Sequence, residues 1–234
     1  MCNSNYAPNG VADYTVMLIL LSLRKYKPAL WRAQVNDYSL AGLQGRELRN
    51  LTVGILGTGK IGAAVIKNLS GFGCRILASD IRENPSLKGL CTYVDNETLY
   101  KACDIISLHM PLLESTRHFV NAETIAKMKD GVTIINCARG ELMNIPDMIR
   151  GIETQKIGAL ALDVFDKEDG IYHENRRDDI LSNRDMAYLR QFPNVIMTQH
   201  MAFYTDAAVQ SMVFCGIEGL CDFAKTGHTA TELV

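Results

Sequence analysis

Residues 52–62 read TVGILGTGKIG, an apolar run followed by three glycines in a Gly-x-Gly-x-x-Gly spacing. The run Thr52–Leu56 is short and apolar, which predicts a buried strand of a parallel sheet. The residues from Ile61 onward predict a helix, so the glycines stand between a strand and a helix. There the first glycine permits a tight turn, the second lets a pyrophosphate approach the backbone, and the third packs helix against strand.

An acidic residue follows at the distance that a dinucleotide site requires. Asp80 ends the next predicted strand, roughly 20 residues after the glycines. A carboxylate there accepts hydrogen bonds from both ribose hydroxyls and repels a 2′-phosphate, which favours NAD over NADP; Arg82 is the one residue that would soften this preference. A bare glycine motif also occurs in structural turns, but its context and Asp80 together predict NAD binding. The expected loop comprises Gly57, Thr58, Gly59, Lys60, Ile61 and Gly62.

Strands and helices alternate along most of the chain. We predict strands at Thr52–Leu56, Arg75–Ser79, Ile105–Leu108, Thr133–Asn136, Ala159–Asp163 and Val195–Thr198, with a weak edge strand near Cys91–Val94. Helices are expected at about Ile61–Gly71, Asn96–Ala102, Ala122–Met128 and Pro146–Thr154. This alternation predicts an α/β fold, a doubly wound parallel sheet with right-handed crossovers.

Three further segments flank or interrupt this alternation. A mostly apolar helix is expected from Pro8 to about Lys25, followed by an amphipathic stretch around Ala29–Val35. The stretch Asp166–Gln191 is charged and is interpreted as a loop with a short helix. A final amphipathic helix begins at Asp206 and runs to about Ala224.

Composition limits the function classes. The 234 residues are 47% hydrophobic, and the 24 basic and 26 acidic residues form no basic stripe, which argues against a nucleic-acid partner. Seven cysteines without a CxxC pair indicate reduced thiols and a cytoplasmic protein. The longest apolar run, Val16–Leu23, is far below the ~20 residues of a membrane span, and no signal peptide is evident. The remaining histidines, which lack metal-ligand spacing and are expected to have ordinary roles, are His109, His118, His173 and His228.

Three reactive side chains follow the ends of predicted strands. Arg139 follows Thr133–Asn136, Glu168 comes soon after Asp163, and His200 follows the strand at residues 195–198. The carboxyl ends of parallel strands form the ligand crevice of such sheets, so we expect these side chains to meet. Taken singly, each has a structural explanation: a surface ion pair, an acid in a charged loop and a strand-end histidine.

Together these side chains suit hydride transfer to a 2-keto acid. Arg139 can bind the substrate carboxylate with two hydrogen bonds. His200 can donate a proton to the carbonyl oxygen as a hydride reaches the carbon, and can accept it in the reverse direction. Glu168, hydrogen-bonded to His200, would favour the imidazolium and fix its orientation.

Four segments carry a resemblance to a known family. They are Gly54–Gly62, Asn136–Gly140, Ala161–Val164 and Pro193–His200, and they resemble the successive signatures of the D-isomer-specific 2-hydroxyacid dehydrogenases. The long insert between Glu168 and His200, together with the ending at residues 200–205, is similar to the D-lactate dehydrogenase branch, whose members also act on aryl-lactates and 2-hydroxyglutarate.

The resemblance implies an NAD-binding Rossmann domain with Arg139, Glu168 and His200 as its catalytic residues. It implies that Asp163 meets the nicotinamide carboxamide. It also implies cofactor contacts near Thr58, Ile61, Met110, Pro111, Cys137 and Ala138. Tyr6 and Phe203 are weaker candidates for substrate contact. The substrate would be a small 2-keto or 2-hydroxy acid, no metal or membrane is implied, and a homodimer through the first helix is expected.

The chain also departs from the family pattern. Residues 1–7 resemble the hinge that enters the coenzyme domain, so the expected division is a hinge remnant at 1–7, an NAD-binding domain at 8–205, and a helix and tail of an incomplete substrate domain at 206–234. Gln199 stands where the family usually has proline. Besides a working dehydrogenase, two alternatives remain: an inactive NAD-binding remnant and an NAD-responsive interaction protein.

Overall fold

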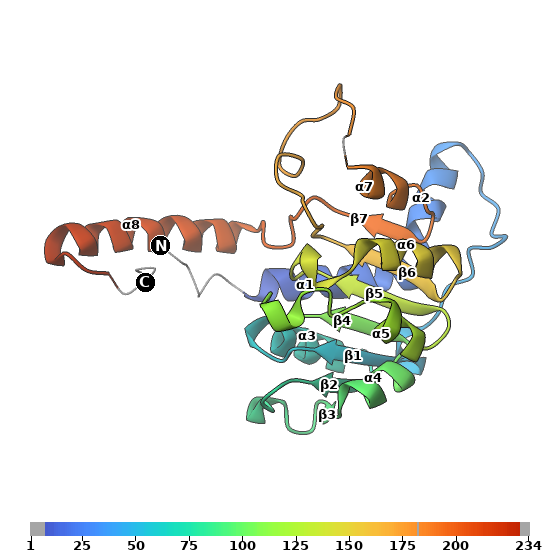
Figure 1. Cartoon of the computed structure of the whole chain (residues 1–234), viewed down its shortest axis with the longest axis horizontal. Helices are drawn as coiled ribbons and strands as arrows, with labels where there is room; N and C mark the ends of the chain where they lie inside the picture. Colours follow the sequence, from blue (N-terminus) through green and yellow to red (C-terminus); the bar gives the residue numbers. More distant parts are fainter. Residues whose placement is uncertain (1–7, 182, 230–234) are drawn as a thin grey trace.

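A computed structural model describes residues 8–181 and 183–229. Seven strands form one parallel sheet in the order β3-β2-β1-β4-β5-β6-β7 (Figure 1). They are β1 Thr52–Leu56, β2 Arg75–Ser79, β3 Thr92–Tyr93, β4 Ile105–Leu108, β5 Val132–Asn136, β6 Ile157–Leu162 and β7 Val195–Met197. The predicted doubly wound α/β sheet is confirmed. The chain builds outward from β1 to β3 and then crosses to β4, so the switch point lies between β1 and β4, where such folds bind ligands.

Helices cover both faces of the sheet (Figure 1). They are α1 Pro8–Leu23, α2 Tyr26–Gln34, α3 Lys60–Ser70, α4 Asn96–Ala102, α5 Ala122–Lys127, α6 Ile145–Glu153, α7 Arg184–Leu189 and α8 Asp206–Thr226. Short 3₁₀ turns lie at η1 Leu48–Asn50, η2 Pro85–Leu87, η3 Glu114–Thr116 and η4 Gly140–Leu142. Alternate residues of a strand point to opposite faces: Ile55 packs with α1 and α3, whereas Leu56 packs with α4, α5 and α6.

The apolar first helix finds its partner within the chain. Residues such as Val11, Leu18 and Ile19 of α1 are buried against α3, β5 and β6. In contrast, no residue of α2 is buried, and the Trp31 side chain is 63% exposed. The amphipathic stretch around Ala29–Val35 thus forms a helix, but nothing in the described residues covers its apolar side.

Helix α8 projects away from the body of the molecule (Figure 1). Thr205 caps its first turn by accepting a hydrogen bond from the Ala208 N–H, and Gly227 ends it in the left-handed conformation. An apolar stripe of this helix is exposed: Val213, Ile217 and Leu220 are each more than half accessible. The helix is also long and apolar enough to cross a membrane, because few charges interrupt it, although soluble helices pass the same test.

Candidate active site

One cavity gathers residues from most of the predicted motifs. It measures about 450 Å³ and lies at the carboxyl ends of β4, β5 and β6. Its lining includes Ile61, Met110, Pro111, Cys137, Ala138, Arg139, Asp163, His200 and Phe203. The topology therefore brings side chains together from the segments that follow five strands, β1, β4, β5, β6 and β7.

The glycine loop has the shape of a cradle for a pyrophosphate. Gly57 has a φ of 94°, and a Cβ there would lie 2.7 Å from the carbonyl carbon of His109. A Cβ on Gly62 would collide with the Gly57 carbonyl, so α3 packs directly against the loop. A Cβ on Gly59, by contrast, would meet no atom within 4 Å. The open space beside Gly59, at the start of α3, fits a dinucleotide phosphate.

Asp80 lies at the end of β2, exposed and beside the glycine loop. Its Oδ2 accepts hydrogen bonds from the Thr58 N–H at 2.5 Å and from the Thr58 hydroxyl at 3.0 Å. Burial alone would raise the pKa of Asp80, but these bonds and one from the Arg82 N–H outweigh it and lower the pKa. The carboxylate is therefore ionised and available to ribose hydroxyls.

A tyrosine that the sequence did not indicate supports this arrangement. The Tyr93 hydroxyl donates to the Thr58 hydroxyl at 2.9 Å and accepts from the Asn84 N–H at 2.9 Å. The Asn84 side chain in turn donates to the Thr58 carbonyl at 3.1 Å. This network links the glycine loop to the segment between β2 and β3, and so fixes the surroundings of Asp80.

His200 and Glu168 form an ion pair beside the cavity. The His200 Nδ1 lies 2.5 Å from Oε1 of Glu168, and Oε2 of Glu168 accepts a hydrogen bond from the Phe165 N–H at 2.7 Å. The bond to Glu168 raises the pKa of His200 above its usual 6.5, although burial acts in the opposite direction. Burial would raise the pKa of Glu168, but the bonds from His200 and Phe165 lower it. The pair thus favours an imidazolium beside a carboxylate.

The main chain around His200 is held by Asp163, which is completely buried. The Asp163 carboxylate accepts hydrogen bonds from the Thr198 hydroxyl at 2.6 Å, the Met201 N–H at 3.0 Å and the Ala202 N–H at 2.8 Å. Its carbonyl accepts from the His200 N–H at 2.7 Å. The turn after β7 is therefore fixed by Asp163, a role that sequence spacing did not indicate.

Arg139 lies just beyond the end of β5, with an exposed side chain. Its Nη1 donates to the Ala138 carbonyl at 2.6 Å, and no ion pair to it occurs within residues 8–181 and 183–229. Arg139 therefore does not form, within these residues, the surface ion pair that was the alternative explanation for its presence. The Asn136 side chain ties this motif together, donating to the Arg139 carbonyl at 2.8 Å and accepting from the Ala138 N–H at 2.9 Å.

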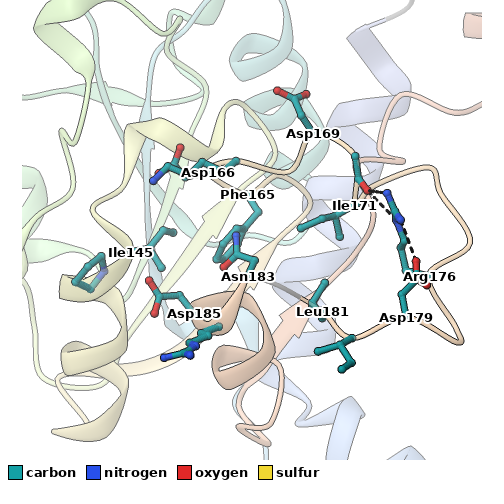
Figure 2. A pocket seen from close by; sticks show the side chains of 15 residues that line it. Ile145, Phe165, Asp166, Asp169, Ile171, Arg176, Asp179, Leu181, Asn183 and Asp185 are labelled. Carbon is teal, nitrogen blue, oxygen red and sulfur yellow. Dashed lines mark hydrogen bonds and ion pairs between the residues drawn. The ribbon is translucent and has the colours of Figure 1, made fainter.

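The remaining predicted residues have varied positions. The Phe203 ring is half-buried, its centroid 6.1 Å from that of the His200 ring. Lys60 is exposed at the start of α3, and Tyr6 lies outside the described residues. Figure 2 shows a second, larger cavity of about 1010 Å³, lined by residues between Ile145 and Asp185. None of the three predicted catalytic residues lines that cavity, so its size does not locate the chemistry.

Comparisons with known proteins agree with this geometry. The sequence profile described as the D-isomer specific 2-hydroxyacid dehydrogenase, NAD binding domain, matches residues 16–202. The chain belongs to this family. The family match confirms the prediction of an NAD-binding domain.

Individual relatives extend the match to almost the whole chain. An aromatic 2-oxoacid reductase of Clostridium sporogenes is 44% identical over 98% of this chain and 70% of its own length. A D-lactate dehydrogenase of Curvularia clavata is 38% identical over 98% of this chain and 66% of its own. The structure of a D-lactate dehydrogenase from Aquifex aeolicus, complexed with NAD and lactic acid, has a TM-score of 0.90 and 31% identity, covering 99% of this chain and 73% of that one.

Proposed function

We propose that this member of the 2-hydroxyacid dehydrogenase family interconverts a small 2-keto acid and its D-2-hydroxy acid with NAD. The observation that carries the proposal is the His200–Glu168 pair, because its histidine lines the same cavity as Arg139 and the other residues after β5. The names of the relatives support a 2-keto acid with a small or aromatic side chain.

The glycine loop would hold the pyrophosphate of the dinucleotide, Asp80 its ribose hydroxyls, and Cys137 and Ala138 its nicotinamide end. When bound, the dinucleotide would supply the hydride in one direction and accept it in the other. An open position at Gly59 and an ionised Asp80 fit this group. The lack of a Cβ beside the phosphates is what permits the close approach.

The protein's own groups bind the acid and move the proton. Arg139 holds the substrate carboxylate and so places the keto carbon beside the nicotinamide. Because Nδ1 of His200 is engaged by Glu168, Nε2 is the atom left to donate a proton to the keto oxygen. Glu168 stabilises the imidazolium before the transfer, and the buried Asp163 keeps the turn that carries the ring in place.

The test is NADH consumption by the purified chain, offered pyruvate, 2-ketoglutarate and phenylpyruvate, with an NADH-binding titration beside it. We expect turnover that is lost in His200→Ala, with NADH binding retained. Tight NADH binding without any turnover would contradict the proposal and would support a cofactor-binding protein instead.

We also propose a cytoplasmic homodimer. The cysteines of the described residues are all free, which agrees with a reducing compartment. The residues of α1 expected to form the dimer interface are mostly covered by the chain itself. Large apolar side chains are exposed instead on α2 and the loop after it, among them Trp31, Tyr38 and Leu40. We therefore place the interface on this surface, which we call the α2 patch.

A further inference from the structure

A second histidine lies behind the predicted catalytic one. Glu168 begins a tight turn, in which its carbonyl accepts hydrogen bonds from the N–H groups of Ile171 and Tyr172, both at 3.0 Å. The turn brings His173, which has a φ of 63°, back towards the segment after β7. The Nε2 of His173 lies 3.1 Å from the carbonyl oxygen of His200. Because a carbonyl can only accept, Nε2 of His173 is the donor.

The backbone of His200 needs such a contact. Its φ is 53°, in the left-handed region that a residue with a side chain seldom adopts. Such a conformation persists only where the surroundings enforce it. The N–H of His200 is fixed by the Asp163 carbonyl at 2.7 Å, whereas its carbonyl is fixed by His173. The two contacts hold the peptide groups on both sides of the left-handed residue.

The same short segment therefore holds both the ring and the backbone of His200. Glu168 binds the ring through Nδ1 at 2.5 Å, and His173, on the turn that Glu168 begins, binds the carbonyl. The His173 ring also lies 6.1 Å from the His200 ring and 6.2 Å from the Phe203 ring, measured between centroids. A shift of the backbone at His200 would lengthen the bond to Glu168 and change the orientation of the ring.

We propose that His173 is a positioning residue, which holds the carbonyl of His200 and thereby aims its ring at the substrate while keeping it paired with Glu168. The inference rests on the proposed function for its catalytic meaning. We call the two contacts of this segment with His200, from Glu168 to the ring and from His173 to the carbonyl, the clamp. The clamp is a structural property of this chain, and its effect on the pKa of His200 can be measured without turnover.

The charged groups that face His200 allow the clamp to be distinguished from simple electrostatics. Glu168 and Asp163 raise the pKa of His200, and Arg139 lowers it. A protonated His173, 6.1 Å away, would add a second positive charge that also lowers it. Removing that charge would raise the pKa of His200, whereas loosening the bond to Glu168 would lower it. The two effects have opposite signs.

The experiment is an NMR titration of the histidine ring protons in the purified chain, with the His200 signal assigned from His200→Ala. His173→Leu removes the donor, and His173→Gln keeps an N–H donor at a similar reach without a titrating ring. We expect the pKa of His200 to fall in His173→Leu and to stay near the wild-type value in His173→Gln. Glu174→Gln, a change at an exposed neighbour, should leave it unchanged.

Two results would overturn the proposal. A rise in the pKa of His200 in both variants would show that His173 acts only as a neighbouring charge, and no change in either would show that the contact is idle. Where the chain turns over a 2-keto acid, His173→Leu should lower kcat about 10-fold, against the ~100-fold cost of a 1 Å displacement, with rescue by His173→Gln. Failure of turnover in the wild type would contradict the proposed function but would leave the titration decisive for the clamp.

Discussion

In the proposed reaction, the proton that His200 exchanges with substrate sets the pH dependence. Reduction needs the imidazolium, and the bond to Glu168 raises the pKa of His200 above 6.5. We expect kcat/KM for keto-acid reduction to be constant below that raised pKa and to fall above it, and the rate of hydroxy-acid oxidation to rise over the same range. In Glu168→Gln the descending limb should move to lower pH, because the charge that stabilises the imidazolium is gone. Burial lowers the pKa of His109 to about 4, so the titration of His109 does not change the kcat/KM profile near neutral pH.

These profiles are measured as kcat/KM across the pH range for both proteins. A Glu168→Gln enzyme with reduced activity but an unmoved limb would show that Glu168 orients the ring without tuning its proton affinity. His118→Gln is a matched control, because His118 is a histidine outside the cavity.

We expect Asp80 to decide the choice between the two nicotinamide cofactors. Replacement by Asn removes the charge that favours ribose hydroxyls and repels a 2′-phosphate. Because hydrogen bonds to a charged group contribute roughly 1.5–3 kcal/mol, we expect NADH affinity to fall about 10-fold or more and the discrimination against NADPH to shrink. Fluorescence titrations with both cofactors measure this. Equal losses for NADH and NADPH would place Asp80 outside the ribose site, and Glu83→Gln serves as the exposed control.

At the scale of elements, the arginine motif and the Glu168 segment are in direct backbone contact. A Cβ on Gly140, at the start of η4, would collide with the main chain of Phe165 and Asp166. Gly140→Ala must therefore push the Glu168 segment away. We expect a loss of roughly 1–3 kcal/mol in the free energy of unfolding, typical of overpacking, together with reduced activity. Urea denaturation measures this change in the free energy of unfolding.

The matched control for this change is Gly216→Ala in α8. A Cβ there would meet no atom within 4 Å, and alanine is the better helix former by up to about 1 kcal/mol. Stability should therefore be unchanged or slightly higher. If Gly140→Ala changed the free energy of unfolding as little as this control does, the segment after β6 would be able to shift at little energetic cost. Its contact with η4 would then not position Glu168.

The strands could be predicted from the sequence because each is a short apolar run that begins and ends within a few residues of the expected bounds. β7 ends at Met197, one residue before the predicted end, and the Thr198 side chain there donates a hydrogen bond to Asp163. That bond, and the contact of His173 with His200, join loops far apart in the chain, so no local periodicity signals them. The exposure of Trp31 could not be predicted either, because an apolar stripe on a helix indicates a buried face but does not identify the surface that buries it.

At the scale of the whole molecule, two apolar surfaces are exposed among the described residues, on α2 and on α8, and they differ in how they are attached to the body. Helix α8 stands alone, whereas α2 is fixed to the body by Lys27, whose Nζ donates to the carbonyls of Arg190, Phe192 and Val195 at 2.7–2.8 Å. A fixed surface loses less conformational entropy on association, which favours the α2 patch as the dimer interface.

Sedimentation velocity over a dilution series tests this assignment. We expect the wild type to be a dimer, Trp31→Ser with Leu40→Ser to shift it to monomer, and Phe214→Ser with Ile217→Ser in α8 to leave the dimer intact. NADH affinity should be unchanged in both double variants, because neither surface lines the cavity beside His200. If the α8 variant alone dissociates the dimer, the interface lies on the projecting helix. In that case the apolar stripe of α8, and not the α2 patch, drives association.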